Sequence, residues 1–258
     1  MRAPGIHLKF KIMEEKIALI DGDSLIYFEM GKPTLEDAIE GLDHRLYEIL
    51  NKCETTKYAG FLTIGKCFRY TAAKTKKYKG NRKKGNKPII FYALKEYLKQ
   101  EWKFEHIPEL EADDLVSVYH DPLKTIICSP DKDVLYQNVG VHYNYGKAEK
   151  VVMDETDSTH FLWKQMLMGD STDGIQGIPK VGPKTADLWL KDVDLLDMPS
   201  FVLKKYIEKF GNHDGISKFV ETFNLVYILK SKEDVLRETG IELSKLVIND
   251  IKQSEELW

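Results

Sequence analysis

Acidic residues recur along this chain at the ends of short apolar stretches. Asp21 and Asp23 follow one such stretch, and Asp131 and Asp133 follow another. The full set of candidate site acids is Asp21, Glu111, Asp113, Asp114, Asp131, Asp133, Asp170 and Asp173. Like charges gathered in one cleft repel and raise one another's pKa, and divalent cations relieve that repulsion. Oxygen ligands without histidine or cysteine favour Mg²⁺ or Mn²⁺, and two such ions about 4 Å apart suit phosphodiester hydrolysis.

The spacing within each acidic group decides whether its carboxylates can reach one point. Asp131 and Asp133 point the same way if their segment is extended. Asp170 and Asp173 converge in a bent or helical segment, and the acids from Glu111 onward share a helical face. Each group alone is usually a solvated turn or a helix cap. Four of them, each next to an apolar segment, favour a shared site.

The stretch Gly177-Ile-Pro-Lys-Val-Gly182 reads as a tight connection between two helices. Its glycines predict a turn with positive φ, and Pro183 suits the first turn of the following helix. The free N–H groups at that helix start suit a phosphate oxygen. Lys180 and Lys184 add positive charge. A purely structural helix connection is an equally good interpretation of this stretch by itself.

Basic residues are concentrated in one part of the chain. Residues 66–87 contain ten Lys or Arg residues and no acid, although the formal net charge of the whole chain is −3. Such a run is most often a solvated loop. Tyr70 and Tyr78 lie within it, and aromatic rings can stack on unpaired bases, which favours contact with nucleic acid.

Apolar patterning places these residues on an α/β scaffold. Short apolar runs at 16–20, 58–64, 125–128 and 139–145 predict strands, and helices are expected at 34–50 and 88–102. From about residue 158 we expect helices only, at 199–210, 216–230 and 243–251 among others. Strands followed by helices predict an α/β body, residues 1–155 with a basic segment at about 66–102. A helical lobe would follow at 156–258, with the helix–hairpin–helix at about 163–190.

Composition places the chain among ordinary cytoplasmic proteins. Of its 258 residues, 43% are hydrophobic and 31% are charged. Three cysteines, Cys53, Cys67 and Cys128, lack metal-ligand spacing and predict free thiols in a reducing compartment. No apolar run approaches the length of a membrane span, and no signal core opens the chain. We expect a cytoplasmic monomer that does not contact a membrane.

The order of these motifs resembles the 5′-nuclease superfamily of flap endonucleases and 5′–3′ exonucleases, and is most similar to the exonucleases of tailed phages. The similarity spans about residues 16–230. Its carriers are Leu19-Ile-Asp-Gly-Asp23, Tyr78-Lys-Gly-Asn-Arg82, Leu110-Glu-Ala-Asp-Asp114, Ser129-Pro-Asp-Lys-Asp133, and Gly169-Asp-Ser-Thr-Asp173 running into 177–186.

The resemblance implies a PIN-like core, a mixed and mostly parallel sheet flanked by helices, with a helical lobe. It implies a Mg²⁺- or Mn²⁺-dependent 5′–3′ exonuclease or flap endonuclease of phage replication or recombination. The substrates would be DNA with 5′ ends, flaps or nicks, and RNA primers or RNA/DNA hybrids. A host-cytosol location follows if the chain is phage-encoded.

The resemblance also implies a role for each matched position. The first metal would take Asp21, Glu111 and Asp113, with Asp114 beside them. The second would take Asp131, Asp133 and Asp173, with Asp170 adjoining. Catalysis would depend on Lys79, Arg82, Asp21 and Asp131. Contacts to DNA are expected from Arg69, Lys74, Tyr78, Lys79, Arg82, Lys83, Gly177, Lys180, Gly182, Lys184 and Thr185. The hairpin would hold K⁺ through its carbonyls.

One position departs from the family pattern, which has an aspartate just after the second strand. The stretch from Gly60 to Arg69 contains no acid, and Ile64 or a neighbour occupies that place. We expect weaker binding of the first metal, with Asp23 as a partial substitute. Three alternatives stay open. They are a non-catalytic relative that binds branched DNA, a phosphatase of the haloacid-dehalogenase type suggested by Asp21-Gly-Asp23, and a PIN-type ribonuclease without the hairpin.

Overall fold

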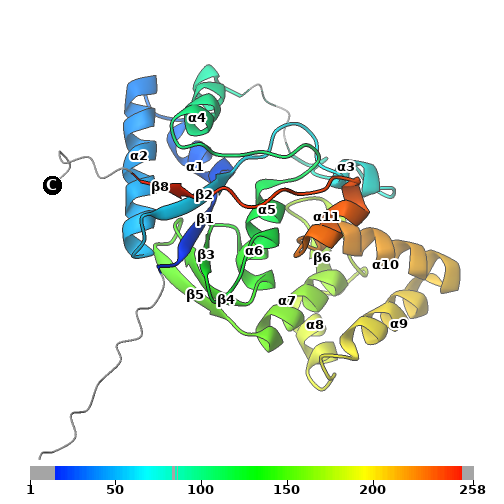
Figure 1. Ribbon diagram of the computed structural model, residues 1–258. Helices are drawn as coiled ribbons and strands as arrows, with labels where there is room; N and C mark the ends of the chain where they lie inside the picture. The colour runs from blue at the N-terminus through cyan, green and yellow to red at the C-terminus, as the bar shows by residue number, and fades with distance from the viewer. Residues whose placement is uncertain (1–14, 83–84, 86, 252–258) are drawn as a thin grey trace, which may run out of the picture.

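The computed structural model describes residues 15–82, 85 and 87–251. A six-stranded sheet forms the body, in the order β5-β4-β3-β1-β2-β8 (Figure 1). Its strands are β1 (Ile17–Asp21), β2 (Lys57–Phe61), β3 (Thr125–Cys128), β4 (Gly140–Asn144), β5 (Glu149–Met153) and β8 (Asn249–Asp250). The central strands are parallel, whereas β5 and β8 pair antiparallel at the two edges. The predicted mixed, mostly parallel sheet is confirmed.

Helices cover both faces of this sheet. Successive residues of a strand point to opposite faces, so β1 contributes side chains to two separate cores. Ala18 and Ile20 of β1 face a core formed with α1 (Gly22–Glu29), α2 (Leu35–Lys52) and α4 (Ile89–Gln100). Leu19 faces the other core, which includes α5 (Ala112–Val118), α6 (Lys132–Gln137) and α11 (Lys232–Thr239). With both faces covered, the central strands β1 and β3 are short, buried and mostly apolar.

A helical lobe with its own core lies beside the body (Figure 1). It contains α7 (Glu155–Met168), α8 (Pro183–Leu190), α9 (Met198–Phe210) and α10 (Asn212–Val226), with a small hairpin of β6 (Gly169–Asp170) and β7 (Ile175–Gln176). Short α3 (Arg69–Ala72) packs against α10 through the same apolar cluster, so the basic segment begins on the lobe.

Two expectations about the chain after residue 158 are wrong. Residues 243–251 form no helix, because Asn249 and Asp250 pair with β2 instead. Ile228, Val235 and Leu243 pack into the core of the body. The lobe therefore ends near residue 227, and the chain returns to the α/β body.

The cysteines and the N-terminal cap of α2 agree with the predictions from the sequence. Cys53, Cys67 and Cys128 are buried free thiols, as predicted. Thr34 caps α2 by accepting a hydrogen bond from the Asp37 N–H at 3.1 Å. Within the described residues, no helix has the length and apolarity that a membrane crossing requires.

Candidate active site

Three of the predicted acids are the residues at which helices begin. Asp21 ends β1 and caps α1, where its carboxylate accepts the Asp23 N–H at 3.0 Å. Asp131 caps α6 in the same way, through the Asp133 N–H at 2.8 Å. Glu111 stands at the N-terminus of α5. Carboxylates are favoured there because the positive end of the helix dipole and free N–H groups face them.

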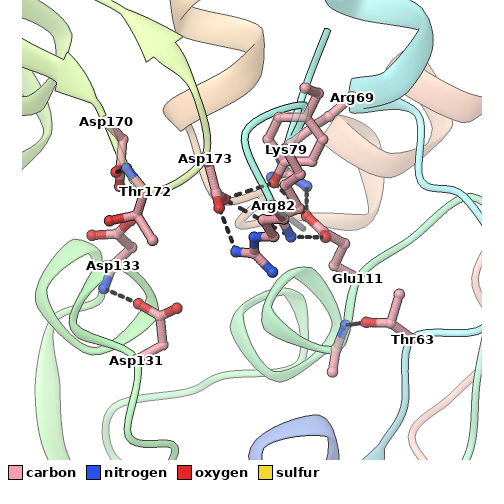
Figure 2. Close-up of polar contacts among 12 residues, drawn as sticks. Thr63, Arg69, Lys79, Arg82, Glu111, Asp131, Asp133, Asp170, Thr172 and Asp173 are labelled. Atoms are coloured by element: carbon pink, nitrogen blue, oxygen red, sulfur yellow. Dashed lines mark hydrogen bonds and ion pairs between the residues drawn. The ribbon is translucent and has the colours of Figure 1, made fainter. Parts of the chain in front are cut away.

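The local geometry of the second acidic group differs from the extended segment expected. Asp133 lies in the first turn of α6, so Asp131 and Asp133 are related as a helix cap and its following turn. Asp170 ends β6, and Asp173 lies in the turn that follows rather than in a helix. Figure 2 shows Asp131, Asp133 and Asp170 together on one side of the site and Glu111 on the other, with Asp173 between them.

Repulsion and burial act together on the acids nearest β1. Burial raises the pKa of Asp21 to about 7, with a further contribution from the charge of Asp23. Burial also raises the pKa of Asp113 well above its ordinary value, and the charges of Asp21, Asp131 and Glu111 add to this effect. Acids at the end of β1 and at the starts of α5 and α6 thus all raise the pKa of Asp113.

A similar effect operates around α6. Burial and then the charge of Asp131 raise the pKa of Asp133 to about 7. Gln165 on α7 donates to Asp133 Oδ2 at 2.9 Å, whereas the buried Oδ1 accepts no hydrogen bond from the described residues and lies 3.8 Å from the Lys132 ammonium. A buried carboxylate oxygen without a hydrogen bond is costly for the protein. A cation at this position would remove that cost.

Two basic side chains lie among the acids. The Lys79 ammonium pairs with Glu111 and lies 3.8 Å from Asp173 Oδ2, and the Arg82 guanidinium pairs with Asp173 (Figure 2). Burial disfavours the charged form of Lys79, but the carboxylates of Glu111 and Asp173 outweigh it and raise the pKa. Tyr78 donates to Glu111 at 2.9 Å and to Asp173 at 3.2 Å.

Three expected contacts are contradicted by burial. Arg69 is 1% exposed and binds both oxygens of Asp114 at 2.7 Å, so it cannot touch DNA. Asp114 is 0% exposed and is fully engaged by Arg69 and backbone N–H groups, which removes it from the metal-facing set. Tyr78 is 4% exposed and cannot stack on a base. Instead these residues form a buried network behind Glu111.

The acids do not form a finished coordination shell. In the part of the chain that the structure describes, no three His, Cys, Asp or Glu side chains are grouped closely enough to hold one metal ion as they stand. Lys79 and Arg82 neutralise Glu111 and Asp173 in this arrangement. The donor set is nevertheless all oxygen, mutually repelling and partly without partners, which fits a hard divalent cation.

The connection between α7 and α8 is built by close backbone contact. Side chains are excluded at Gly169 and Gly177, where an added Cβ would lie 2.3 Å from the backbone of the other segment. The expected positive φ falls on Lys180, at 69°, rather than on Gly177 or Gly182. Pro183 opens α8 as predicted.

The basic residues predicted to contact DNA near this connection differ in their exposure to solvent. Lys180 and Lys184 are exposed beside the connection, with Thr185 half-buried in α8, and Lys74 is exposed at the start of the basic segment. Lys83 lies outside the described residues. The exposed lysines are therefore available to a polyanion, while their contact with DNA stays a prediction.

Several supporting residues were missed by the sequence reasoning. Ser129 donates to Asp21 at 2.9 Å and accepts the Asp131 N–H at 3.1 Å, so it bridges the two strand ends. Thr63 accepts the Ala112 N–H at 2.9 Å, which fixes the start of α5. Ser129 has a signal in the sequence, because it directly follows a buried strand and precedes Asp131 by two residues. Thr63 has none, because its partner is distant in sequence.

Several known nucleases are similar to this chain in sequence. No protein-family model matches the chain. The chain is 28% identical to the 5′–3′ exonuclease of Aquifex aeolicus, over 92% of the chain and 84% of that protein. It is 28% identical to flap endonuclease Xni of Shewanella halifaxensis, over 68% and 77%. DNA polymerase I of Bacillus subtilis is 27% identical over 81% of the chain, which spans only 28% of the polymerase.

Solved structures share the fold. A T5 protein co-crystallised with metal ions has a TM-score of 0.62 at 17% identity, over 87% of this chain and 97% of that one. The bacteriophage T5 flap endonuclease, in a pseudo-enzyme-product complex with DNA and metal ions, has a TM-score of 0.59 at 16% identity, over 81% and 88%. At these identities the likeness concerns the fold alone.

Proposed function

We propose that this chain is a divalent-metal-dependent 5′-nuclease of the 5′-nuclease superfamily, because it is similar over most of its length to 5′–3′ exonucleases and to a flap endonuclease. Its substrates would be DNA with 5′ ends, flaps or nicks, including RNA-primed strands. The observation that carries the proposal is geometric: Ser129 bridges Asp21 and Asp131 at two strand ends, and Lys79 joins Glu111 at the start of α5 to Asp173 after β6.

The acids divide into two groups that would hold Mg²⁺ or Mn²⁺. Asp21, Glu111 and Asp113 lie at the ends of β1 and the start of α5. The second group is Asp131, Asp133, Asp170 and Asp173. The Oδ1 atom of Asp133 accepts no hydrogen bond from the described residues and has only the Lys132 ammonium at 3.8 Å, which supports a cation there. Such ions, when bound, activate water and stabilise the oxyanion that leaves. By the resemblance we also propose a K⁺ ion at the 177–182 carbonyls.

The chain's own basic groups would bind and orient the phosphate. Lys79 and Arg82 are the cations nearest Asp173 and would release their carboxylates to contact a phosphate oxygen. Tyr78, buried behind them, would hold Glu111 and Asp173 in position through its hydroxyl. Lys180 and Lys184 would grip the duplex backbone, together with the free N–H groups at the start of α8.

The missing acid after β2 bears on metal affinity. Asp23, a candidate substitute, accepts the Thr63 N–H at 3.1 Å and lies 3.6 Å from the Lys95 ammonium. Its carboxylate is thus already engaged at the end of β2. We propose that the first metal binds more weakly than in relatives that keep the acid.

A cleavage assay tests the function directly. The full chain is incubated with 5′-labelled flap, nicked and RNA-primed duplexes in Mg²⁺ and in Mn²⁺, beside Asp131→Ala. We expect products from the 5′ end with the unmodified chain and at least about a hundredfold slower cleavage with the variant. Tight binding of branched DNA without cleavage in either metal would favour the non-catalytic relative, and equal cleavage by both proteins would point to a contaminant.

A further inference from the structure

One carboxylate of the lobe holds the start of the basic segment. Glu221 lies on α10, and its Oε1 accepts the backbone N–H groups of Lys74 and Thr75, each at 2.6 Å. The Thr75 hydroxyl donates to Oε2 at 2.5 Å. Hydrogen bonds to a charged acceptor are stronger than those between neutral groups. Three of them converge on Glu221 from two successive residues.

Packing gives this part of the segment little support. Residues 74–77 are exposed on the outer side. On the inner side Thr75 and Lys76 border a cavity of about 320 Å³, whose other walls include Ile178, Glu221 and Thr222. A segment with solvent outside and a cavity inside has few apolar contacts to fix it. Its position therefore depends on the hydrogen bonds that it makes to Glu221.

The far end of the segment is fixed to another part of the lobe. The Lys79 N–H donates to the Asp173 carbonyl at 2.8 Å, and the Asn81 amide donates to the Ser171 carbonyl at 2.7 Å. Residues 74–82 are thus held at one end by α10, at the other by the turn after β6, and between them by buried Tyr78. The side chains of Lys79 and Arg82 project from the part after Tyr78 toward the acids (Figure 2).

The same turn of α10 also contacts the connection between α7 and α8. Thr222, next to Glu221, donates to the Gln176 carbonyl at 3.2 Å, one residue before Gly177. Neighbouring residues of one rigid helix therefore touch both the expected duplex-binding connection and the segment that carries Lys79. A displacement of one relative to the other would have to break one of these bonds.

We propose that Glu221 is a positioning residue for the nuclease reaction, an inference that rests on the proposed function. It fixes the start of segment 74–82 so that Lys79 and Arg82 face the phosphate when the connection at 177–182 holds the duplex. Glu221 acts on the site through the hydrogen bonds that it accepts from Lys74 and Thr75, and not by pairing with a site acid. Freed from Glu221, the segment would sample positions in which Lys79 is misplaced, and small misplacements cost large factors in rate.

Glu221→Ala and Glu221→Gln separate positioning from charge. The glutamine keeps an oxygen for both N–H groups and offers its NH₂ group to the Thr75 hydroxyl, which can accept. Glu208→Ala is the matched control, because Glu208 also lies in the lobe and pairs only with Lys205, at 2.9 Å. We expect Glu221→Ala to lower kcat on a 5′-flap duplex about 10- to 100-fold, with KM changed by less than about twofold. Glu221→Gln should stay within about threefold of the unmodified chain.

A second measurement does not depend on activity. Hydrogen exchange of peptides covering 74–82, without metal or DNA, should be about tenfold faster in Glu221→Ala and unchanged in the other two variants. Unchanged exchange and kcat in Glu221→Ala would overturn the inference, as would a glutamine variant as impaired as the alanine one. If Glu221→Ala fails to fold, Thr75→Val, which removes one donor only, must show the same effects in smaller measure, and their absence counts against the inference. No cleavage by the unmodified chain would refute the proposed function, while the exchange result would still judge the role of Glu221.

Discussion

The buried pair of Arg69 and Asp114 allows the sharpest prediction of stability. Arg69 is 1% exposed and Asp114 is 0% exposed, and two parallel hydrogen bonds of 2.7 Å join them. Arg69→Met leaves the Asp114 carboxylate without its cation in a site closed to water. Breaking a buried pair in this way costs about 3–5 kcal/mol, so we expect the free energy of unfolding to fall by that amount.

Removing both partners should cost less than removing one. Arg69→Met combined with Asp114→Leu eliminates the unpaired charge, and leaves the Tyr227 carbonyl and the N–H of Leu229 without their partners. Unsatisfied groups of this kind cost roughly 1–3 kcal/mol. We therefore expect the double variant to be more stable than Arg69→Met alone.

Urea unfolding of the full chain measures these differences. The control is Arg237→Met, whose side chain is 58% exposed and pairs with Asp234 at 2.8 Å, and it should change stability by less than about 1 kcal/mol. The salt dependence of DNA binding should be the same for folded Arg69→Met as for the unmodified chain, because a buried guanidinium neutralises no phosphate. A cost for Arg69→Met below about 1 kcal/mol, or a salt slope reduced by about one, would refute the reasoning.

Three further predictions concern the site and the sheet. Lys79→Ala should slow cleavage more than it weakens duplex binding, whereas Lys184→Ala should weaken binding and flatten its salt slope; equal effects on both quantities would contradict this. Ile64→Asp should raise Mn²⁺ affinity, read by calorimetry without DNA, and unchanged affinity would refute a role for the missing acid. Burial lowers the pKa of fully buried His142 to about 4. Because the unfolded chain binds that proton first, stability should fall by up to about 3 kcal/mol as pH drops from about 6.5 to 4, and His142→Gln should flatten the decline.

The acids were predictable because each obeys a local rule. Asp21 and Asp131 follow apolar strands and precede helices, and a carboxylate in that position both caps the helix and faces the carboxyl edge of a parallel sheet. Pro183 predicts the start of α8 by an equally local rule, because proline suits the first turn of a helix. Patterns that extend over a few residues were thus enough to predict the positions of these acids at the ends of strands and the starts of helices.

The predictions that the structure contradicts concern residues whose partners lie far away in the sequence. Arg69 reads as one more cation in a basic run, and only its partner Asp114, 45 residues away, shows that it is buried. Tyr78 is withdrawn from the surface by Glu111 in the same way. The spacing of the apolar residues after 243 is typical of a helix. The open edge of β2 nevertheless provides backbone hydrogen-bond partners for Asn249, and this pairing outweighs the local preference for a helix.

The return of the chain to β2 gives the helical lobe two attachments rather than one. The lobe leaves the body after β5 at Met153 and comes back beyond Val226, and Asn249 then closes the edge of the sheet. A unit joined at both ends cannot swivel freely as one on a single linker can. Movement of the lobe relative to the body is therefore confined to hinge bending about the line between these two connections.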